Sequence, residues 1–299
     1  MGSAQRHGPV ANDSSREDTA RSQSSSSNQT VSPQKKAARS ESVPEGASIS
    51  ISRMEVPVRV LITSDLHANL EAVRSLPWDY DQLWVLGDIV NYGPNPSEAV
   101  EFVREHASLI VRGNHDDAIG YDRDPQCSAT YRRMAEETAR FTMSVLSEEQ
   151  REFLRRLPLM AGRDIDGVRF LLCHGTPADP LHEYRPADSD LWAKDAGQKF
   201  CDVLLSGHTH IPFCRAVGAR RVANPGSVGQ SKQVGGRACY AIWEAGQLRL
   251  ESVEYAVEAT IGKVRDLPVS QDVREQLETV LRTGSLPTPE TDEKVVVKR

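Results

Sequence analysis

Positive charge is not in excess in this sequence, and aromatic residues are few. Of its 299 residues, 36 are Lys or Arg and 42 are Asp or Glu, which gives a formal net charge of −6. Such a balance provides no general attraction to nucleic acid or to an anionic membrane surface. Aromatic residues make up 6% of the chain, and the four tryptophans are scattered and do not resemble a base-stacking platform. General nucleic-acid binding is therefore not expected.

Long apolar runs and paired cysteines are also missing. The sequence has no run of about 18 apolar residues and no apolar core of an export signal near its start, so we expect a cytoplasmic protein without membrane contact. The five cysteines form no CxxC pair and are odd in number. We expect them to be reduced core thiols rather than disulfides or a thiolate metal site. They are Cys127, Cys173, Cys201, Cys214 and Cys239.

The two ends of the chain differ in composition from its middle. Residues 1–53 contain fourteen serines and few apolar residues, too few to offset the entropy of ordering, so we expect a disordered tail. An apolar segment begins just after Met54, and we hypothesise that Met54 is the true initiator. We assign residues 54–284 to one domain and expect residues 285–299 to be a flexible C-terminal tail.

Between these ends, short apolar, β-branched runs alternate with helical patterns. This alternation is typical of an α/β fold with buried strands. The predicted strands are 58–63, 82–86, 108–111, 168–173 and 203–206. Residues 128–146 show a helical pattern between chemical motifs, and we expect them to form a helical insert near the active site.

The last third of the domain has a different pattern. Apolar runs separated by Gly-containing turns follow Pro212 and predict antiparallel strands, and two helical patterns come after them. The predicted strands are 213–217, 239–243 and 248–253, and the predicted helices are 257–265 and 271–282.

Histidine, aspartate and asparagine cluster directly after five of the predicted strands. In an open α/β sheet, this carboxyl edge is where ligands bind. Five of the eight histidines lie there, a distribution that solvated surface histidines would not produce. The polar residues are Asp65, His67, Asp88, Asn114, His115, Asp116, His174, His208 and His210.

The residue types at these positions suit divalent metal ions. Imidazole, carboxylate and amide ligands fit manganese, iron, zinc or nickel, whereas a structural zinc site usually has four ligands and includes thiolates. Seven of these nine residues are candidate ligands, which is too many for one ion. Two ions about 4 Å apart and bridged by a carboxylate are the arrangement that clamps the attacking and leaving oxygens of a phosphoester.

Taken together, the motifs resemble the signature of the calcineurin-like metallophosphoesterases. The order and spacing of the motifs are compatible with that family over residues 56–255, and the closest likeness is to its small bacterial phosphodiesterases. The resemblance implies a two-sheet α/β sandwich flanked by helices. The matching segments are Asp65-x-His67, Gly87-Asp88, Gly113-Asn114-His115-Asp116, His174-Gly175 and Gly207-His208-x-His210.

The resemblance also implies roles for single residues. It implies that Asp65, His67 and His210 hold one ion. It implies that Asn114, His174 and His208 hold the other, with Asp88 shared between the two. His115 would face the substrate, where it would stabilise phosphoryl oxygens or protonate the leaving group, and Asp116 would orient its imidazole. A hydroxide bridging the ions would attack phosphorus, since two cations lower the pKa of bound water.

Other residues carry weaker signals. Asn91 and Tyr92 either line the substrate side or belong to a turn, and residues 224–229 either approach the metals or form a plain loop. We expect Arg112 to point away from the site. A solvated loop is the favoured interpretation for His182 and Tyr184, and we expect residues 121–160 and 176–200 to shape the pocket.

The function expected from this pattern is metal-dependent hydrolysis of a phosphodiester or a small organic phosphate. Two enzymatic alternatives belong to the same superfamily: a protein phosphatase and a dinucleotide polyphosphate hydrolase. Asp116 disfavours the protein phosphatase, which usually has Glu after the catalytic histidine. A noncatalytic scaffold is disfavoured because all seven candidate ligands and His115 are present. The sequence does not indicate the natural substrate, the physiological metal or the oligomeric state.

Overall fold

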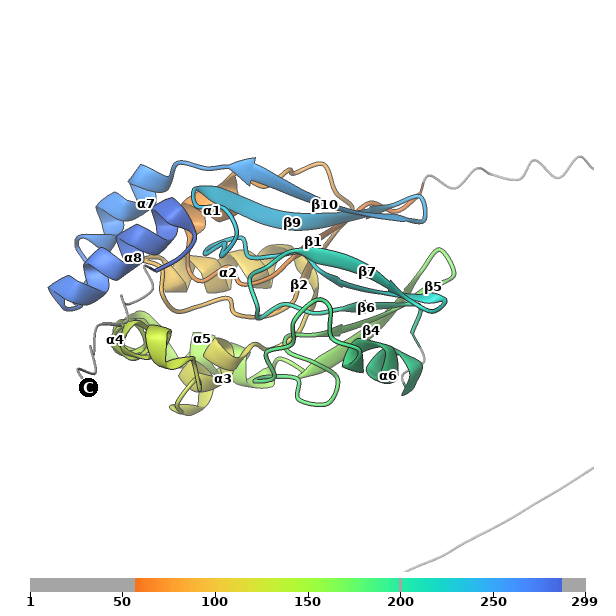
Figure 1. Ribbon diagram of the computed structural model, residues 1–299. Coiled ribbons are helices and arrows are strands. Elements are labelled where there is room, and N and C mark those ends of the chain that lie inside the picture. The colour runs from red at the N-terminus through yellow and green to blue at the C-terminus, as the bar shows by residue number, and fades with distance from the viewer. Residues whose placement is uncertain (1–56, 199–200, 287–299) are drawn as a thin grey trace, which may run out of the picture. The chain divides into compact units, whose positions relative to one another are not determined.

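The computed structural model describes residues 57–198 and 201–286 (Figure 1). The predicted disordered tail, residues 1–53, lies outside these ranges, and so do residues 287–299 of the predicted C-terminal tail. In the described ranges, no helix has the length and apolar character needed to span a bilayer.

The described residues form two mixed sheets of five strands each. In the first sheet β1, β2 and β3 run parallel, and β9 and β10 are antiparallel to their neighbours. Its order is β10 (Gln247–Glu254), β9 (Arg237–Glu244), β1 (Val60–Thr63), β2 (Gln82–Val85) and β3 (Ala107–Ile110). The order of the second is β4 (Met160–Ile165), β5 (Val168–Cys173), β6 (Val203–Leu205), β8 (Arg220–Asn224) and β7 (Phe213–Val217). The predicted two-sheet α/β sandwich is confirmed.

Alternating side chains along the strands produce the layers. Val60 and Ile62 belong to the core between the sheets, whereas Leu61 belongs to the core on the helix-covered face of the first sheet. This period-two pattern is what a strand buried on both faces requires. The intersheet core is centred on Phe170, whose ring packs edge-on against Trp84 and Trp243 with centroid distances of 5.1 and 4.9 Å.

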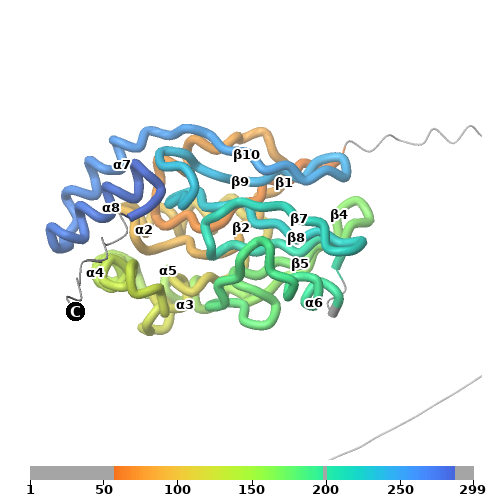
Figure 2. Tube along the Cα trace, in the orientation of Figure 1, coloured from red at the N-terminus to blue at the C-terminus, as the bar shows by residue number. Residues whose placement is uncertain are grey.

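Helices cover the outer faces and one end of the sandwich. The first sheet packs against α1 (Leu70–Arg74), α2 (Pro96–His106) and α5 (Glu148–Arg156), and the second against α6 (Leu191–Gln198). The remaining helices are α3 (Asn114–Tyr121), α4 (Ala129–Val145), α7 (Val257–Val264) and α8 (Gln271–Thr283). Helices α4, α7 and α8 share a core of their own around Met134, Ile261 and Leu277, and lie at the same end of the sheets (Figure 2).

The predicted insert, 128–146, corresponds closely to α4. All five predicted buried strands are present, but α1, α6, β4 and β8 were not predicted because these elements are short or mostly exposed. The five cysteines are free: Cys173, Cys201 and Cys239 are buried, Cys127 is half-buried and Cys214 is exposed. Three of the five cysteines are therefore buried free thiols.

Candidate metal and active site

The polar segments singled out in the sequence converge in space. They follow β1, β2 and β3 of the first sheet and β5 and β6 of the second, so both sheets contribute to one rim. One difference from expectation concerns Asn114, His115 and Asp116, which form the first turn of α3 rather than a loop. All seven predicted metal ligands lie in two adjoining groups.

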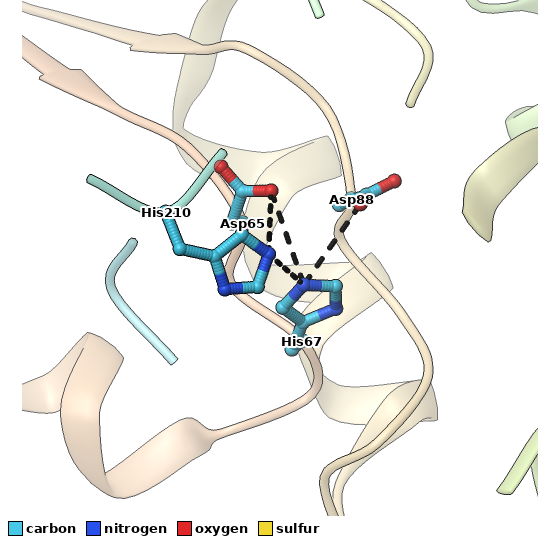
Figure 3. Close-up of side chains that lie close together, drawn as sticks. All are labelled: Asp65, His67, Asp88 and His210. Carbon is cyan, nitrogen blue, oxygen red and sulfur yellow. Dashed lines mark hydrogen bonds and ion pairs between the residues drawn. The ribbon is translucent and has the colours of Figure 1, made fainter. Parts of the chain in front are cut away.

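The first group contains Asp65, His67, Asp88 and His210, whose side chains point toward one another (Figure 3). His210 Nε2 lies 3.2 Å from Asp65 Oδ1 and 3.1 Å from His67 Nε2. His67 Nε2 lies 3.8 Å from Asp88 Oδ2. All four side chains are buried, so water does not screen these charges.

The second group shares Asp88 with the first and adds His174 and His208. His174 Nε2 lies 3.2 Å from Asp88 Oδ2 and 3.2 Å from His208 Nδ1. The amide oxygen of Asn114 is 3.0 Å from the same nitrogen, and the Asn114 amide donates to the carbonyl of Pro125 at 2.7 Å. Because the amide NH₂ is occupied by a carbonyl, the Asn114 oxygen is the atom presented to the group.

Backbone carbonyls set the tautomers of three of these imidazoles. The Nδ1 atoms of His67, His174 and His210 lie 3.2, 2.8 and 2.7 Å from the carbonyls of Val90, Leu86 and Gln230. A carbonyl only accepts, so each Nδ1 carries hydrogen and donates, and in the neutral ring each Nε2 presents a lone pair. Such a backbone contact is the usual support of a metal-binding histidine.

In both Asp65 and Asp88, one carboxylate oxygen accepts a hydrogen bond from a backbone amide and the other faces imidazoles. Asp65 Oδ2 accepts from the amide of His208 at 3.2 Å, while Asp65 Oδ1 is buried without a hydrogen bond. Asp88 Oδ1 accepts from the amide of His115 at 2.9 Å, which leaves Oδ2 for both groups. Unpaired acceptors that face each other at hydrogen-bond distance fit a bound cation, and the donor set suits a divalent ion.

The electrostatics of the cluster also demand positive charge. Burial alone would raise the pKa of Asp65 and Asp88, but the neighbouring histidines outweigh it and lower both values, so both groups stay ionised. Burial opposes protonation of His174, yet the carboxylates of Asp88 and Asp65 raise its pKa to about 9. Burial and His174 lower the pKa of His208 to about 3. Two ionised carboxylates buried in one cluster favour a bound cation beside them.

Backbone strain is concentrated in this rim. Five of the seven candidate ligands have positive φ, between 44° and 66°, where residues other than Gly are uncommon. They are Asp65, His67, Asp88, His208 and His210. Close approach also requires glycine at Gly113, where an added Cβ would lie 2.1 Å from Asp88 Oδ1. The turns at these residues direct their side chains into the two groups.

Asp116 was predicted to orient the His115 imidazole, but its carboxylate bonds to backbone amides. Its carboxylate accepts from the amides of Ile89 at 2.8 Å and Gly113 at 3.0 Å, so it caps α3 and attaches that helix to the segment after β2. Burial and the Asp88 charge raise the pKa of Asp116 to about 7. His115 instead has its Nδ1 2.8 Å from the Asn91 amide nitrogen, which is also 3.3 Å from the Ala135 carbonyl. Asn91 therefore positions His115.

A cavity of about 440 Å³ opens beside the two groups. His115, Tyr92 and residues of the segment before α4 line it, which puts the helical insert next to the site as predicted. His182 and Tyr184 also line it, and Tyr184 is exposed, as the interpretation of a solvated loop expects for it. Tyr131 also lines the cavity and lies in the 121–160 segment that was expected to shape the pocket, whereas Gln230 and Lys232 lie outside both expected segments.

Two remaining interpretations have clear outcomes. Arg112 points away from the site as expected, with its guanidinium 3.3 Å from Asp117 and bonded to the carbonyl of Arg155. The 224–229 segment contacts the rim through the backbone of Asp65. The hydroxyl of Ser227 and the amide of Gly229 donate to the Asp65 carbonyl at 2.8 and 3.0 Å.

Comparison with known proteins agrees with this geometry. The model of the calcineurin-like phosphoesterase superfamily domain matches residues 58–247. The chain belongs to the calcineurin-like phosphoesterase superfamily. Members of this superfamily typically have a binuclear metal centre, and the Asp and His groups described above are candidates for it.

Individual members of the superfamily are also similar. An uncharacterized protein of Methanocaldococcus jannaschii is 30% identical over 69% of this chain and 91% of its own. The crystal structure of a metallophosphoesterase from Sphaerobacter thermophilus is 30% identical, with a TM-score of 0.64 over 75% of this chain and 99% of its own. A symmetrical bis(5′-nucleosyl)-tetraphosphatase of Vibrio parahaemolyticus is 31% identical over 44% of this chain and 48% of its own.

Proposed function

We propose that this superfamily member is a metal-dependent hydrolase of a phosphodiester or a small organic phosphate. In this proposal Asp65, His67 and His210 bind one divalent cation. Asn114, His174 and His208 would hold a second, and Asp88 would serve both. Manganese, iron, zinc and nickel all fit the ligand types. A cytoplasmic location, expected from the sequence, accompanies the proposal.

One observation carries the proposal: imidazole nitrogens that present lone pairs face each other. His67 Nε2 and His210 Nε2 are 3.1 Å apart, and both rings already donate through Nδ1 to backbone carbonyls. Burial lowers the pKa of His67 well below its usual range, so this ring is neutral. Two acceptors at that distance repel each other, and a cation between them removes the repulsion.

The protein's own groups supply orientation and proton transfer. When bound, the two cations would supply Lewis-acid polarisation of the phosphoryl oxygens and a nucleophile active at neutral pH. His115 lines the cavity, and its Nδ1 faces the Asn91 amide, so Nε2, which lies 3.5 Å from Cys127 Sγ, is the proton-carrying atom. This nitrogen is suited to donate to a phosphoryl oxygen or to the leaving group.

A second candidate substrate class is the dinucleoside polyphosphates. The likeness to the Vibrio parahaemolyticus bis(5′-nucleosyl)-tetraphosphatase favours it, and a cavity of about 440 Å³ is large enough for part of such a substrate. Both candidates use the same metal and histidine chemistry and differ only in the substrate.

Hydrolysis of bis(p-nitrophenyl) phosphate by manganese-loaded protein tests the proposal. We expect turnover that chelation abolishes and manganese restores, and we expect Asp88→Asn to be inactive because both groups lose their shared ligand. Asp79→Asn is the matched control, since the Asp79 side chain is exposed. Turnover that survives exhaustive chelation, or an active Asp88→Asn variant, would refute the proposal.

A further inference from the structure

Lys232 brings a second positive centre into the cavity that adjoins the candidate metal groups. The lysine is half-buried and lines the cavity together with His115 and His208. Its Nζ lies 4.9 Å from the ring centroid of Tyr131 and 5.2 Å from that of Tyr184. The two aromatic faces stabilise the ammonium in this position.

A chain of hydrogen bonds fixes the position of the Lys232 ammonium relative to the rim. Lys232 Nζ donates to the Tyr184 hydroxyl at 3.0 Å, and that hydroxyl donates to the carbonyl of Thr209 at 2.8 Å. Thr209 lies between the candidate ligands His208 and His210. The position of the Lys232 charge is therefore tied to the same turn that places two imidazoles.

The charge of Lys232 has no carboxylate partner in the part of the chain that the structure describes. By contrast, Lys263 on α7 forms an ion pair with Glu71 at 2.6 Å. An ammonium has three N–H donors, and the Tyr184 hydroxyl uses one of them. A half-buried cation with free donors in a ligand-sized cavity is suited to bind an anion.

We propose that Lys232 is a specificity-determining residue that binds a second phosphoryl group of the substrate, distinct from the one that is cleaved. The inference rests on the proposed function, because the cleaved phosphoryl group occupies the candidate metal site. The candidate metal site would bind the phosphoryl group that reacts, so the Lys232 ammonium is available to a neighbouring phosphoryl group. Substrates with two or more phosphoryl groups are therefore preferred over those with one.

Kinetics with two substrates test this preference. Diadenosine tetraphosphate carries several phosphoryl groups, and bis(p-nitrophenyl) phosphate carries one. We expect Lys232→Met to lower kcat/KM for the tetraphosphate by about 10- to 100-fold, at least tenfold more than for the chromogenic diester. Lys232→Arg retains the charge and should keep most of the preference. Lys194→Met is the control, because Lys194 is exposed on α6.

Binding measurements separate this inference from the proposed function. Calorimetry on metal-loaded protein would compare AMP with the non-hydrolysable α,β-methylene-ADP. We expect the second phosphoryl group to tighten binding to the wild type and to the Lys194→Met protein, but not to Lys232→Met. A wild type that hydrolyses neither substrate refutes the proposed function. Equal losses for both substrates, or an equal gain in binding for wild type and Lys232→Met, overturn the inference.

Discussion

The side-chain amide nitrogen of Asn91 lies 2.8 Å from Nδ1 of His115, and both side chains are buried. The same amide is 3.3 Å from the carbonyl of Ala135 on α4. A carbonyl accepts only from the NH₂ group, so the amide orientation is set and His115 Nδ1 acts as the acceptor. Asn91 therefore links the helical insert to the orientation of the proposed catalytic imidazole.

Removing this contact should affect turnover more than substrate binding. We expect Asn91→Ala to lower kcat by about 10- to 100-fold with KM changed less than about threefold, because the His115 ring loses its orienting partner. Asn91→Gln keeps an NH₂ donor for Nδ1 and should recover part of the rate. Steady-state kinetics with bis(p-nitrophenyl) phosphate measure both. Equal rates for Asn91→Ala and wild type would show that the contact is not needed.

Replacing His115 itself separates proton transfer from metal binding. We expect His115→Ala to reduce turnover by about 10² to 10⁴ while the bound metal stays near two ions per chain. Elemental analysis of the purified variant gives the metal content. If the metal were lost together with activity, His115 would have to be a ligand rather than a group that faces the substrate.

Gly113 tests the close approach between two segments of the rim. An added Cβ would lie 2.1 Å from Asp88 Oδ1 and 2.3 Å from the Asp88 nitrogen, so Gly113→Ala should displace the shared carboxylate. We expect weaker metal binding and a loss of about 1–3 kcal/mol in the free energy of unfolding. In α7, a Cβ on Gly262 meets nothing within 4 Å, and Gly262→Ala should leave metal binding intact. Similar behaviour of the two variants would contradict this account.

Metal removal should lower thermal stability through the same ligands. A cation at 100 times its Kd stabilises the folded state by about 2.7 kcal/mol, provided that the unfolded chain does not bind it. We expect manganese to raise the Tm of the wild type and of Asp79→Asn, whose aspartate is exposed. Asp88→Asn should show little increase. Calorimetry of all three proteins makes the comparison, and a normal increase in Asp88→Asn would argue against a shared carboxylate.

Residues 1–53 should be dispensable for catalysis. Their composition offers too little apolar surface to form a core, and every candidate ligand follows residue 64. A chain that begins at Met54 should retain kcat and metal content close to those of the full chain. Loss of most activity on truncation would mean that the first 53 residues contribute to the site.

The sequence predicted the candidate site best at the ends of strands, where the residue type decides which side chains can bind a metal. The segments after β1, β2, β3, β5 and β6 were predicted as one rim, because buried parallel strands have strong apolar signatures and their carboxyl ends coincide. Helix α4 was predicted because its apolar stripe is long. The strands β4 and β8 were missed, since β4 is largely exposed and β8 lies next to a turn.

Contacts between distant segments were beyond the reach of sequence patterns. The family resemblance implied that Asp116 orients His115, yet helix capping turns its carboxylate toward Ile89 and Gly113. Asn91 reaches His115 only through its left-handed backbone, with φ of 76°. Lys232 lies outside both segments that were expected to shape the pocket, and no local motif marks it.

Anomalous diffraction from crystals of the manganese-loaded protein would show whether two cations share Asp88. We expect two manganese peaks, both next to Asp88. The first should lie among Asp65, His67 and His210, and the second among Asn114, His174 and His208. A single peak, no peak, or peaks away from Asp88 would contradict this expectation.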